Sequence, residues 1–230
     1  MSDLRIDVVI PIYGQHGMTE RCLAALARQT RRHRTIVVDS ATPCDRAPAI
    51  RDRFPDVEVV ALEADRGSGA ACNAGIARGS GEVVVLLDGD VLAPPSFLEQ
   101  LTAPFAEHPR LGSVAAVLRR SGTQLIESAG LAVDCTLAGF PRLRGRPERL
   151  ATAPRPALLG PAEAAAAYRR EALREVGYFD EQIFFCQKDV DLALRLRAAG
   201  WRTLLVAGAR AEHLGRVHTR HMRTRSTTAT

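Results

Sequence analysis

The first part of the chain alternates short runs of Val, Ile and Leu with stretches whose apolar residues recur at helical spacing. Runs of this kind, separated by helices, are typical of a parallel β-sheet that is covered by helices on both faces. The expected strands are 6–12, 35–39, 57–61 and 82–87, and the expected helices between them are 19–29, 47–54 and 68–78. We therefore predict an α/β fold with a mostly parallel sheet flanked by helices.

The second part of the chain is less regular. Its expected helices are 94–108, 169–176 and 189–199, and its expected strands are 111–118 and 201–207. The segment 139–156 is rich in Pro and Arg and predicts a long, mobile loop. With 230 residues, of which 46% are hydrophobic, the chain is long enough for one substantial core.

Composition narrows the class of protein further. No stretch approaches the roughly 20 apolar residues that a membrane-spanning helix needs. No apolar signal segment opens the chain either, so we expect a soluble, cytoplasmic protein. The five cysteines are widely spaced and form no C-x-x-C motif, which favours free thiols. The net charge of +5 suits phosphate-bearing ligands or a membrane surface, and no nucleic-acid-binding motif accompanies it.

The turn Asp88-Gly89-Asp90 follows the expected strand 82–87 and is the first candidate for chemistry. Two carboxylates at the end of a buried strand cost desolvation and repel each other. A divalent cation removes both penalties, and Mg²⁺ and Mn²⁺ prefer oxygen ligands, including substrate phosphates. Gly89 lets both carboxylates face one volume. An acidic turn after a strand is common, however, so the motif alone does not establish a metal site.

Other strand ends carry groups that suit a nucleotide. Ligands bind at the carboxyl ends of parallel strands, so Tyr13, Asp39 and Asp88 are expected at one edge of the sheet. Asp39 could accept a hydrogen bond from a base, Tyr13 could flank a ring, and Gly67 could admit a ligand close to the backbone. Each also has an ordinary structural alternative as a turn, core or loop residue. Together they describe a cleft.

Two residues from the second half complete the candidate set. Asp189 is expected in the first turn of a helix, where the helix dipole keeps a carboxylate ionised and able to take a proton from a sugar hydroxyl. The alternative is that it only caps the helix. His213, after the last expected strand, is a good further ligand for a metal such as Mn²⁺. A surface histidine in a basic tail is the simpler interpretation of His213 on its own.

The ordered set of motifs resembles family 2 of the inverting glycosyltransferases, which have the GT-A fold. The resemblance runs from about residue 7 to about residue 213. The matching segments are Val9-Ile10-Pro11-Ile12-Tyr13, Cys22-Leu23 with Gln29-Thr30, Ile36-Val37-Val38-Asp39, Gly67 with Asn73-Ala74-Gly75-Ile76, Leu87-Asp88-Gly89-Asp90, Tyr168 to Leu173 with Val176 to Glu181, and Asp189-Val190-Asp191-Leu192 with Ala199-Gly200-Trp201. Each motif alone is modest, but their order along one chain is specific.

The resemblance implies a GT-A type, Rossmann-like sheet with a nucleotide-sugar site at the carboxyl ends of the strands. A single domain is expected at 1–218, with a nucleotide-binding half at 1–92 and an acceptor-side half at 93–218. Residues 219–230 are expected to form a disordered tail. The Q-x-x-R-W motif and membrane helices of processive members are absent, so transfer of one sugar to a discrete acceptor is expected.

The resemblance also implies roles for individual residues. Asp189 would be the catalytic base. Asp90 would bind Mn²⁺ or Mg²⁺ directly, with His213 and Asp88 as further ligands. The donor, a UDP or dTDP sugar by preference, would contact Pro11, Tyr13, Asp39, Asp65, Gly67, Asn73, Asp88 and Gly89. The acceptor would be a small molecule or lipid-linked, and contact with a membrane surface and a homodimer are left open.

Three positions depart from the family pattern. Gly14 and Asp65 stand where Asn is usual, and Lys188, the only lysine, stands where Glu is usual. Lys188 could pair with Asp189 and lower its basicity, or it could bind acceptor or phosphate. A second hypothesis is therefore a sugar-nucleotide-binding protein with an impaired catalytic site. A third is a nucleotidyltransferase, although the loop 11–17 lacks the Lys or Arg usual there.

Overall fold

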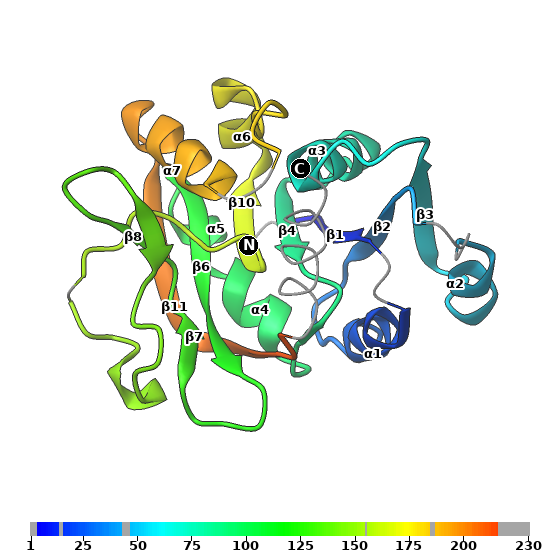
Figure 1. Ribbon diagram of the computed structural model, residues 1–230, viewed down its shortest axis with the longest axis horizontal. Coiled ribbons are helices and arrows are strands. Elements are labelled where there is room, and N and C mark those ends of the chain that lie inside the picture. Colours follow the sequence, from blue (N-terminus) through cyan, green and yellow to red (C-terminus); the bar gives the residue numbers. More distant parts are fainter. Residues whose placement is uncertain (1–3, 14–15, 43–46, 155, 185–186, 216–230) are drawn as a thin grey trace, which may run out of the picture.

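The structure is a computed structural model that describes residues 4–13, 16–42, 47–154, 156–184 and 187–215. One nine-stranded sheet runs through it in the order β3-β2-β1-β4-β10-β6-β11-β5, with β7 paired to β6 (Figure 1). The strands of this sheet are β1 Ile6–Ile12, β2 Arg34–Ser40, β3 Val57–Leu62, β4 Val83–Leu87, β5 Val91–Leu92, β6 Leu111–Arg120, β7 Ile126–Ser128, β10 Ala165–Arg169 and β11 Arg202–His213. Two short strands, β8 Leu131–Val133 and β9 Gly139–Pro141, form a separate hairpin.

The helices lie in two layers, one on each side of the sheet (Figure 1). They are α1 His16–Leu26, α2 Ala47–Arg53, α3 Ser68–Arg78, α4 Phe97–Thr102, α5 Pro104–Glu107, α6 Arg170–Val176 and α7 Lys188–Ala198. Because successive strand residues face opposite sides, Val8 and Ile10 join the core beneath α1, α2 and α4. Val9 and Ile36 join the core beneath α3, α6 and α7. Both faces are thus covered, and the carboxyl edge of the strands is where a ligand can bind.

The first half matches the prediction closely. Strands β3, β2, β1 and β4 are parallel to one another. Strand β1 and helix α3 have the expected bounds, and the other elements of this half differ by a few residues at their ends. The α/β fold with a mostly parallel sheet in this half is confirmed.

Strand β10 was not predicted, and it changes the centre of the sheet. It runs antiparallel between β4 and β6, with Ala165 opposite Leu87 and Ala166 opposite Ala115. A run of alanines has weak strand propensity and reads more readily as helix. Its placement is decided by burial between two apolar strands, which the local sequence does not reveal.

Two further predictions were wrong in their bounds. The expected helix 94–108 is interrupted at Pro104, which has no N–H to continue the hydrogen bonding of α4. The last strand was expected to stop at Ala207, with His213 beyond it. Strand β11 instead continues to His213 after an irregularity between Leu205 and Arg210, which breaks the apolar pattern of the strand.

The segment 139–156 is folded around one buried arginine, contrary to the expectation of a mobile loop. It contains β9 and a short 3₁₀ helix, Glu148–Leu150. The Arg142 side chain is buried and donates hydrogen bonds to the carbonyl oxygens of Ala151, Ala153 and Pro156. One guanidinium group therefore holds three parts of the segment's backbone together through hydrogen bonds.

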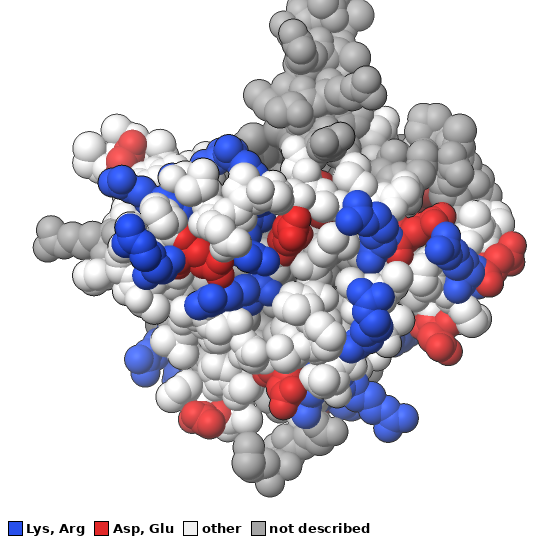
Figure 2. Space-filling view, turned by 90° about the horizontal axis from the view of Figure 1, so that it is seen from below, with Lys and Arg blue, Asp and Glu red and all other residues white. Residues whose placement is uncertain are grey.

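Part of the positive charge is compensated locally. Arg34 and Arg78 both pair with Glu58, and Arg66 lies 2.7 Å from Glu181. On the face shown in Figure 2, acidic side chains lie among the basic ones. No helix of the described chain is long and apolar enough to span a membrane. Several residues singled out above lie outside the described residues: Gly14, and the tail 219–230.

Replacing Arg142 by Met tests the account of segment 139–156. The change removes the donors from three carbonyl groups, so we expect a loss of about 2 to 4 kcal/mol in the free energy of unfolding. We also expect faster proteolysis within the segment. Urea denaturation and limited proteolysis measure these effects. The control Arg146→Ala removes an exposed arginine of the same segment, and equal stability of the two variants would contradict the role of Arg142.

Candidate functional site

The turn Asp88-Gly89-Asp90 is held in place from three sides. The Asp88 N–H donates to the carbonyl of Ala164, the residue before β10, at 3.1 Å. The Cys22 thiol of α1 lies 3.7 Å from the Asp88 carbonyl. The Leu214 N–H, just after β11, donates to the Asp90 carbonyl at 3.0 Å. Elements from distant parts of the chain thus fix the turn.

Strand pairing explains how His213 reaches this turn. Strand β5 begins directly after Asp90 and pairs antiparallel with the end of β11, which places His213 opposite Val91. The His213 Nε2 atom lies 3.1 Å from Asp90 Oδ1. Ligand atoms of Asp88, Asp90 and His213 all lie within 4.8 Å of one another. The three residues expected to bind a cation therefore come together.

The chemistry of this cluster suits a divalent cation. Asp90 is fully buried, and its Oδ2 atom has no hydrogen-bond partner among the described residues. A buried carboxylate oxygen without a partner is costly, and a bound cation would remove that cost. Two carboxylates and an imidazole form a donor set that Mn²⁺ accepts readily and that leaves positions for phosphate oxygens.

A fourth residue, Glu127 on β7, was missed by the sequence analysis. Its Oε2 atom lies 3.3 Å from His213 Nδ1, in an ion-pair contact on the side of the ring away from Asp90. Carboxylates that face the outer nitrogen of a ligating histidine orient the ring and raise its basicity. Nothing in the sequence near Glu127 signals this role, because the contact depends on the pairing of β7 with β6.

The residues expected to bind the nucleotide lie on the neighbouring strands. Asp39 stands opposite Ile12 in the β1–β2 register, so it lies near Tyr13 at the same edge of the sheet. Asp39 is buried, and its Oδ1 atom accepts the N–H of Thr42 at 3.0 Å. One carboxylate oxygen therefore shapes the turn after β2. The roles of Pro11, Tyr13 and Asp39 toward a donor stay predictions.

The other donor-side residues make structural contacts. Gly67 has a backbone φ of 89°, and a Cβ there would come within 2.8 Å of the Phe184 carbonyl oxygen, so glycine is required. The Asn73 side-chain amide donates to the Phe179 carbonyl at 2.9 Å and accepts its N–H at 3.1 Å. Asp65 is exposed and accepts the Gly67 N–H at 3.0 Å. These contacts tie α3 to the segment before α7.

Asp189 lies in the first turn of α7, as expected, and is partly exposed. Lys188, directly before it, forms an ion pair with Glu163. Burial by itself would lower the pKa of Lys188, but the Glu163 carboxylate raises it above its usual value, so the side chain is an ammonium. The partner of the unusual lysine is therefore a residue that the sequence analysis did not consider.

A surface hollow of about 610 Å³ lies beside α3, and its lining includes none of Asp88, Asp90 and His213, which are called the metal cluster below. It is lined by Leu62, Arg66, Ala70, Asn73, Ala74, Ala77, Gly177, Tyr178, Phe179 and Glu181. The polar groups in its wall already bond to one another, as Arg66 and Asn73 do with Glu181. We assign no ligand to it.

Comparison with known proteins gives the class. Residues 7–177 match the model of the family described as glycosyl transferase family 2. The chain is 29% identical over 239 residues to N-acetylglucosaminyl-diphospho-decaprenol L-rhamnosyltransferase of Mycobacterium tuberculosis, covering 93% of this chain and 76% of that protein. It is 28% identical over 222 residues to the O-antigen biosynthesis protein RfbC of Myxococcus xanthus, covering 91% of this chain but 17% of that protein.

Solved structures agree on the fold. The mannosyltransferase PcManGT from Pyrobaculum calidifontis, in complex with GDP-Man and Mn²⁺, superposes with a TM-score of 0.70 at 22% identity, covering 96% of this chain and 60% of that one. GalNAc-T7 with UDP, GalNAc and Mn²⁺ gives a TM-score of 0.74 at 16% identity, covering 94% and 44%. The fold is of the GT-A type. The chain belongs to glycosyl transferase family 2, and it is a glycosyltransferase.

Replacing Glu127 by Gln should weaken cation binding without touching a ligand. The carboxylate faces the outer nitrogen of His213, so we expect a 10- to 100-fold loss of Mn²⁺ affinity, as is usual for such partners. Calorimetric titration of the metal-free protein with Mn²⁺ measures it. The control Glu107→Gln changes an exposed carboxylate on α5. Equal affinities of the two variants would show that Glu127 does not support the histidine.

Cation binding should also depend on pH. Burial by itself would lower the pKa of His213, but the Asp90 and Glu127 carboxylates raise it to about 10, so the ring carries a proton at neutral pH. Because the cation must displace this proton, the Mn²⁺ affinity should rise about tenfold per pH unit between roughly pH 6.5 and 8.5, with about one proton released. Calorimetry in buffers of different ionisation enthalpy measures the release. A pH-independent affinity would exclude His213 as a ligand.

Proposed function

We propose that this chain is a non-processive, metal-dependent, inverting glycosyltransferase that moves one sugar from a nucleotide-sugar to a hydroxyl group of an acceptor. The observation that carries the proposal is the convergence of Asp88, Asp90 and His213 within 4.8 Å at the carboxyl end of β4. The structural neighbours bound to GDP-Man or UDP together with Mn²⁺ support it.

The cluster would hold Mn²⁺ or Mg²⁺ through its two carboxylates and imidazole. When bound, such an ion stabilises the negative charge of the leaving diphosphate as a Lewis acid. The chain itself supplies the rigid setting, because Ala164, Cys22 and Leu214 fix the turn that carries the carboxylates. The Glu127 carboxylate, 3.3 Å from His213 Nδ1, would orient the His213 ring toward the ion.

Asp189 is proposed as the base that takes a proton from the acceptor hydroxyl. That oxygen then attacks the anomeric carbon on the face opposite the leaving diphosphate, which inverts the configuration. The contact between Lys188 and Glu163 supports this role, because the ammonium has a carboxylate partner other than Asp189. The same contact weighs against the hypothesis of an impaired, purely binding protein, which the departure at Lys188 had suggested.

The acceptor side is proposed to lie at the β8–β9 hairpin. The Gly139 N–H donates to the Gln187 side-chain oxygen at 3.1 Å, so the hairpin adjoins the start of α7. Leu137 and Phe140 of this hairpin are 60% and 38% exposed. An apolar surface beside the base suits a lipid-linked acceptor, in keeping with the decaprenol-linked substrate in the name of the mycobacterial relative. A small-molecule acceptor is the alternative to the lipid-linked one. We also propose that the protein acts in the cytoplasm and contacts a membrane surface.

A screen of nucleotide-sugars with Mn²⁺, read by mass spectrometry, is the direct test, beginning with UDP and dTDP sugars. Binding of UDP and Mn²⁺ without turnover of any donor would favour the impaired binding protein instead. Release of pyrophosphate from a sugar phosphate and a nucleoside triphosphate would indicate the nucleotidyltransferase, which the family assignment disfavours.

Replacing Asp189 by Asn should abolish most turnover while leaving nucleotide binding intact. A general base contributes about 100- to 10,000-fold, so kcat should fall by at least about 100-fold with the affinity for UDP and Mn²⁺ unchanged. Asp191→Asn is the matched control, since Asp191 lies in the same first turn but pairs with Arg195 at 2.6 Å. Undiminished turnover by the Asp189 variant would remove it as the base.

A further inference from the structure

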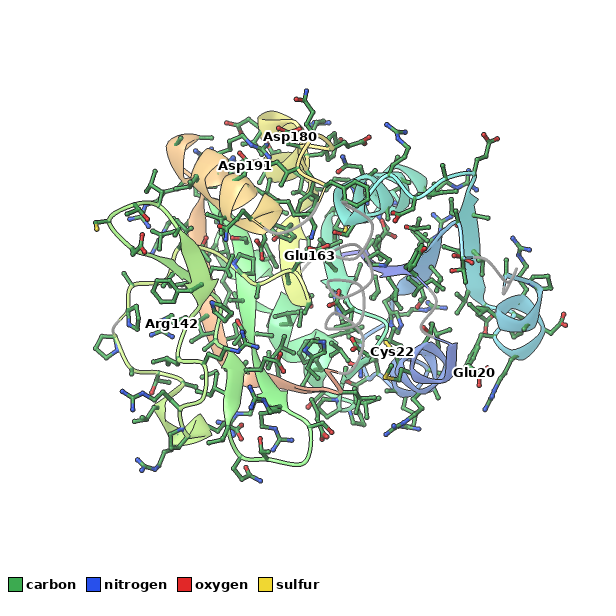
Figure 3. All side chains as sticks on the ribbon, viewed as in Figure 1. Glu20, Cys22, Arg142, Glu163, Asp180 and Asp191 are labelled. Atoms are coloured by element: carbon green, nitrogen blue, oxygen red, sulfur yellow. The ribbon has the colours of Figure 1, made fainter. Side chains whose placement is uncertain are left out.

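A buried polar cluster of Cys72, Glu163 and Lys188 lies between the metal-binding turn proposed at Asp88-Gly89-Asp90 and the start of α7, which carries Asp189. The Lys188 ammonium forms an ion pair with Glu163 Oε2, and the two side chains are only 9% and 12% exposed. The Cys72 thiol of α3 donates to Glu163 Oε1 at 3.1 Å. One carboxylate, two residues before β10, thus joins α3 to α7. Figure 3 shows Glu163 near the centre of the molecule, beside β10.

Each partner of the ion pair is next in sequence to a residue that matters for the proposed site. Glu163 precedes Ala164, whose carbonyl accepts the Asp88 N–H at 3.1 Å. Lys188 directly precedes Asp189 in the first turn of α7. The ion pair therefore links the metal-binding turn to the proposed base through very few covalent bonds.

The start of α7 has few other polar restraints. The Gln187 side chain makes no capping hydrogen bond, and the Val190 N–H donates to Asp189 Oδ1 at 3.0 Å within the turn itself. Gln187 has a left-handed backbone with φ of 63°, which is unfavourable for a residue other than glycine. The Gln187 amide bonds to Gly139, which belongs to the hairpin rather than to the sheet. Among the described contacts, the Lys188–Glu163 pair is the one that ties this turn to the edge of the central sheet.

The surroundings of the pair make it sensitive. Tyr168 of β10 is 1% exposed, and its ring meets Phe179 edge-on with centroids 6.2 Å apart. Burial, with the charges of Asp189 and Glu163 nearby, raises the pKa of Tyr168, so its hydroxyl is neutral. Removing one partner would leave an uncompensated charge in this buried place, and that cost favours neutralisation of the remaining group or a shift of the element that carries it.

We propose that Glu163 and Lys188 are positioning residues that set the place of Asp189 relative to the metal cluster. The inference rests on the proposed function, because it takes Asp189 as the base. It also accounts for the departure at position 188: the lysine is matched by an acidic partner from another part of the chain. Neither residue is proposed to touch the reacting atoms.

The test compares Lys188→Met, Glu163→Gln and the reciprocal double variant Glu163→Lys with Lys188→Glu. Each single variant should lower kcat about 10- to 100-fold, as expected for a misplaced catalytic group. The KM for the donor and the affinity for UDP and Mn²⁺ should change by less than about threefold, since the metal cluster is intact. The double variant should recover a large part of kcat, because it restores opposite charges.

A second buried ion pair provides the control. Arg170 lies 2.7 Å from Asp7, whose side chain is 5% exposed and which stands near the amino end of β1, at the opposite edge of the sheet. Asp7→Asn should lower the stability of the protein but leave kcat unchanged. If the uncharged site variants fail to fold, Glu163→Asp keeps the charge and shortens the side chain. A reduced kcat at unchanged nucleotide affinity supports the proposal there too.

Several outcomes overturn the inference. They are wild-type kcat in the folded single variants or in Glu163→Asp, a reciprocal variant that folds without recovering activity, and a loss of kcat in Asp7→Asn as large as in the site variants. Failure of the proposed function looks different, because the wild-type protein itself would then turn over no donor. In that case, a crystal structure of Lys188→Met still tests whether the ion pair sets the place of Asp189. If Asp189 keeps its original position relative to Asp88 in that variant, the inference is refuted.

Discussion

The site depends on the burial of one carboxylate, that of Asp90, at the carboxyl end of the central sheet. A charge with no exposed surface needs a compensating partner, and the only histidine brought to it among the described residues comes from the far end of the chain. The antiparallel pairing of β5 with β11 makes that meeting possible. The turn Asp88-Gly89-Asp90 and the last strand therefore require each other, and neither half of the chain contains the complete candidate site by itself.

This dependence explains which features could be predicted. Apolar runs and glycine stops are local signals, so the strands and helices of the first half follow from the sequence. Asp88, Asp90 and His213 were predicted to be metal ligands because their types and order resemble a known pattern, and the geometry brings the three side chains together. The placement of His213 on β11, rather than after it, was hidden by the irregularity near Arg210.

The features that escaped prediction all arise from contacts between distant segments. Strand β10 is built from alanines whose local preference opposes its role. Glu127 and Glu163 are ordinary acidic residues until strand pairing and helix packing place them beside His213 and Lys188. Arg142 is one of many arginines, and only its burial among three carbonyls distinguishes it. A single sequence carries no signal for such pairs.

The hydrogen bonds from Arg142 to three carbonyl groups also bear on how the sequence of this segment can vary. The backbone of segment 139–156 is organised from within, by a guanidinium that its own carbonyls surround. Its outward side chains can therefore vary without disturbing the path of the chain. If the acceptor binds at this part of the chain, as proposed, surface replacements there would change the molecules that the transferase modifies, while the residues proposed to act on the sugar–phosphate bond would stay constant.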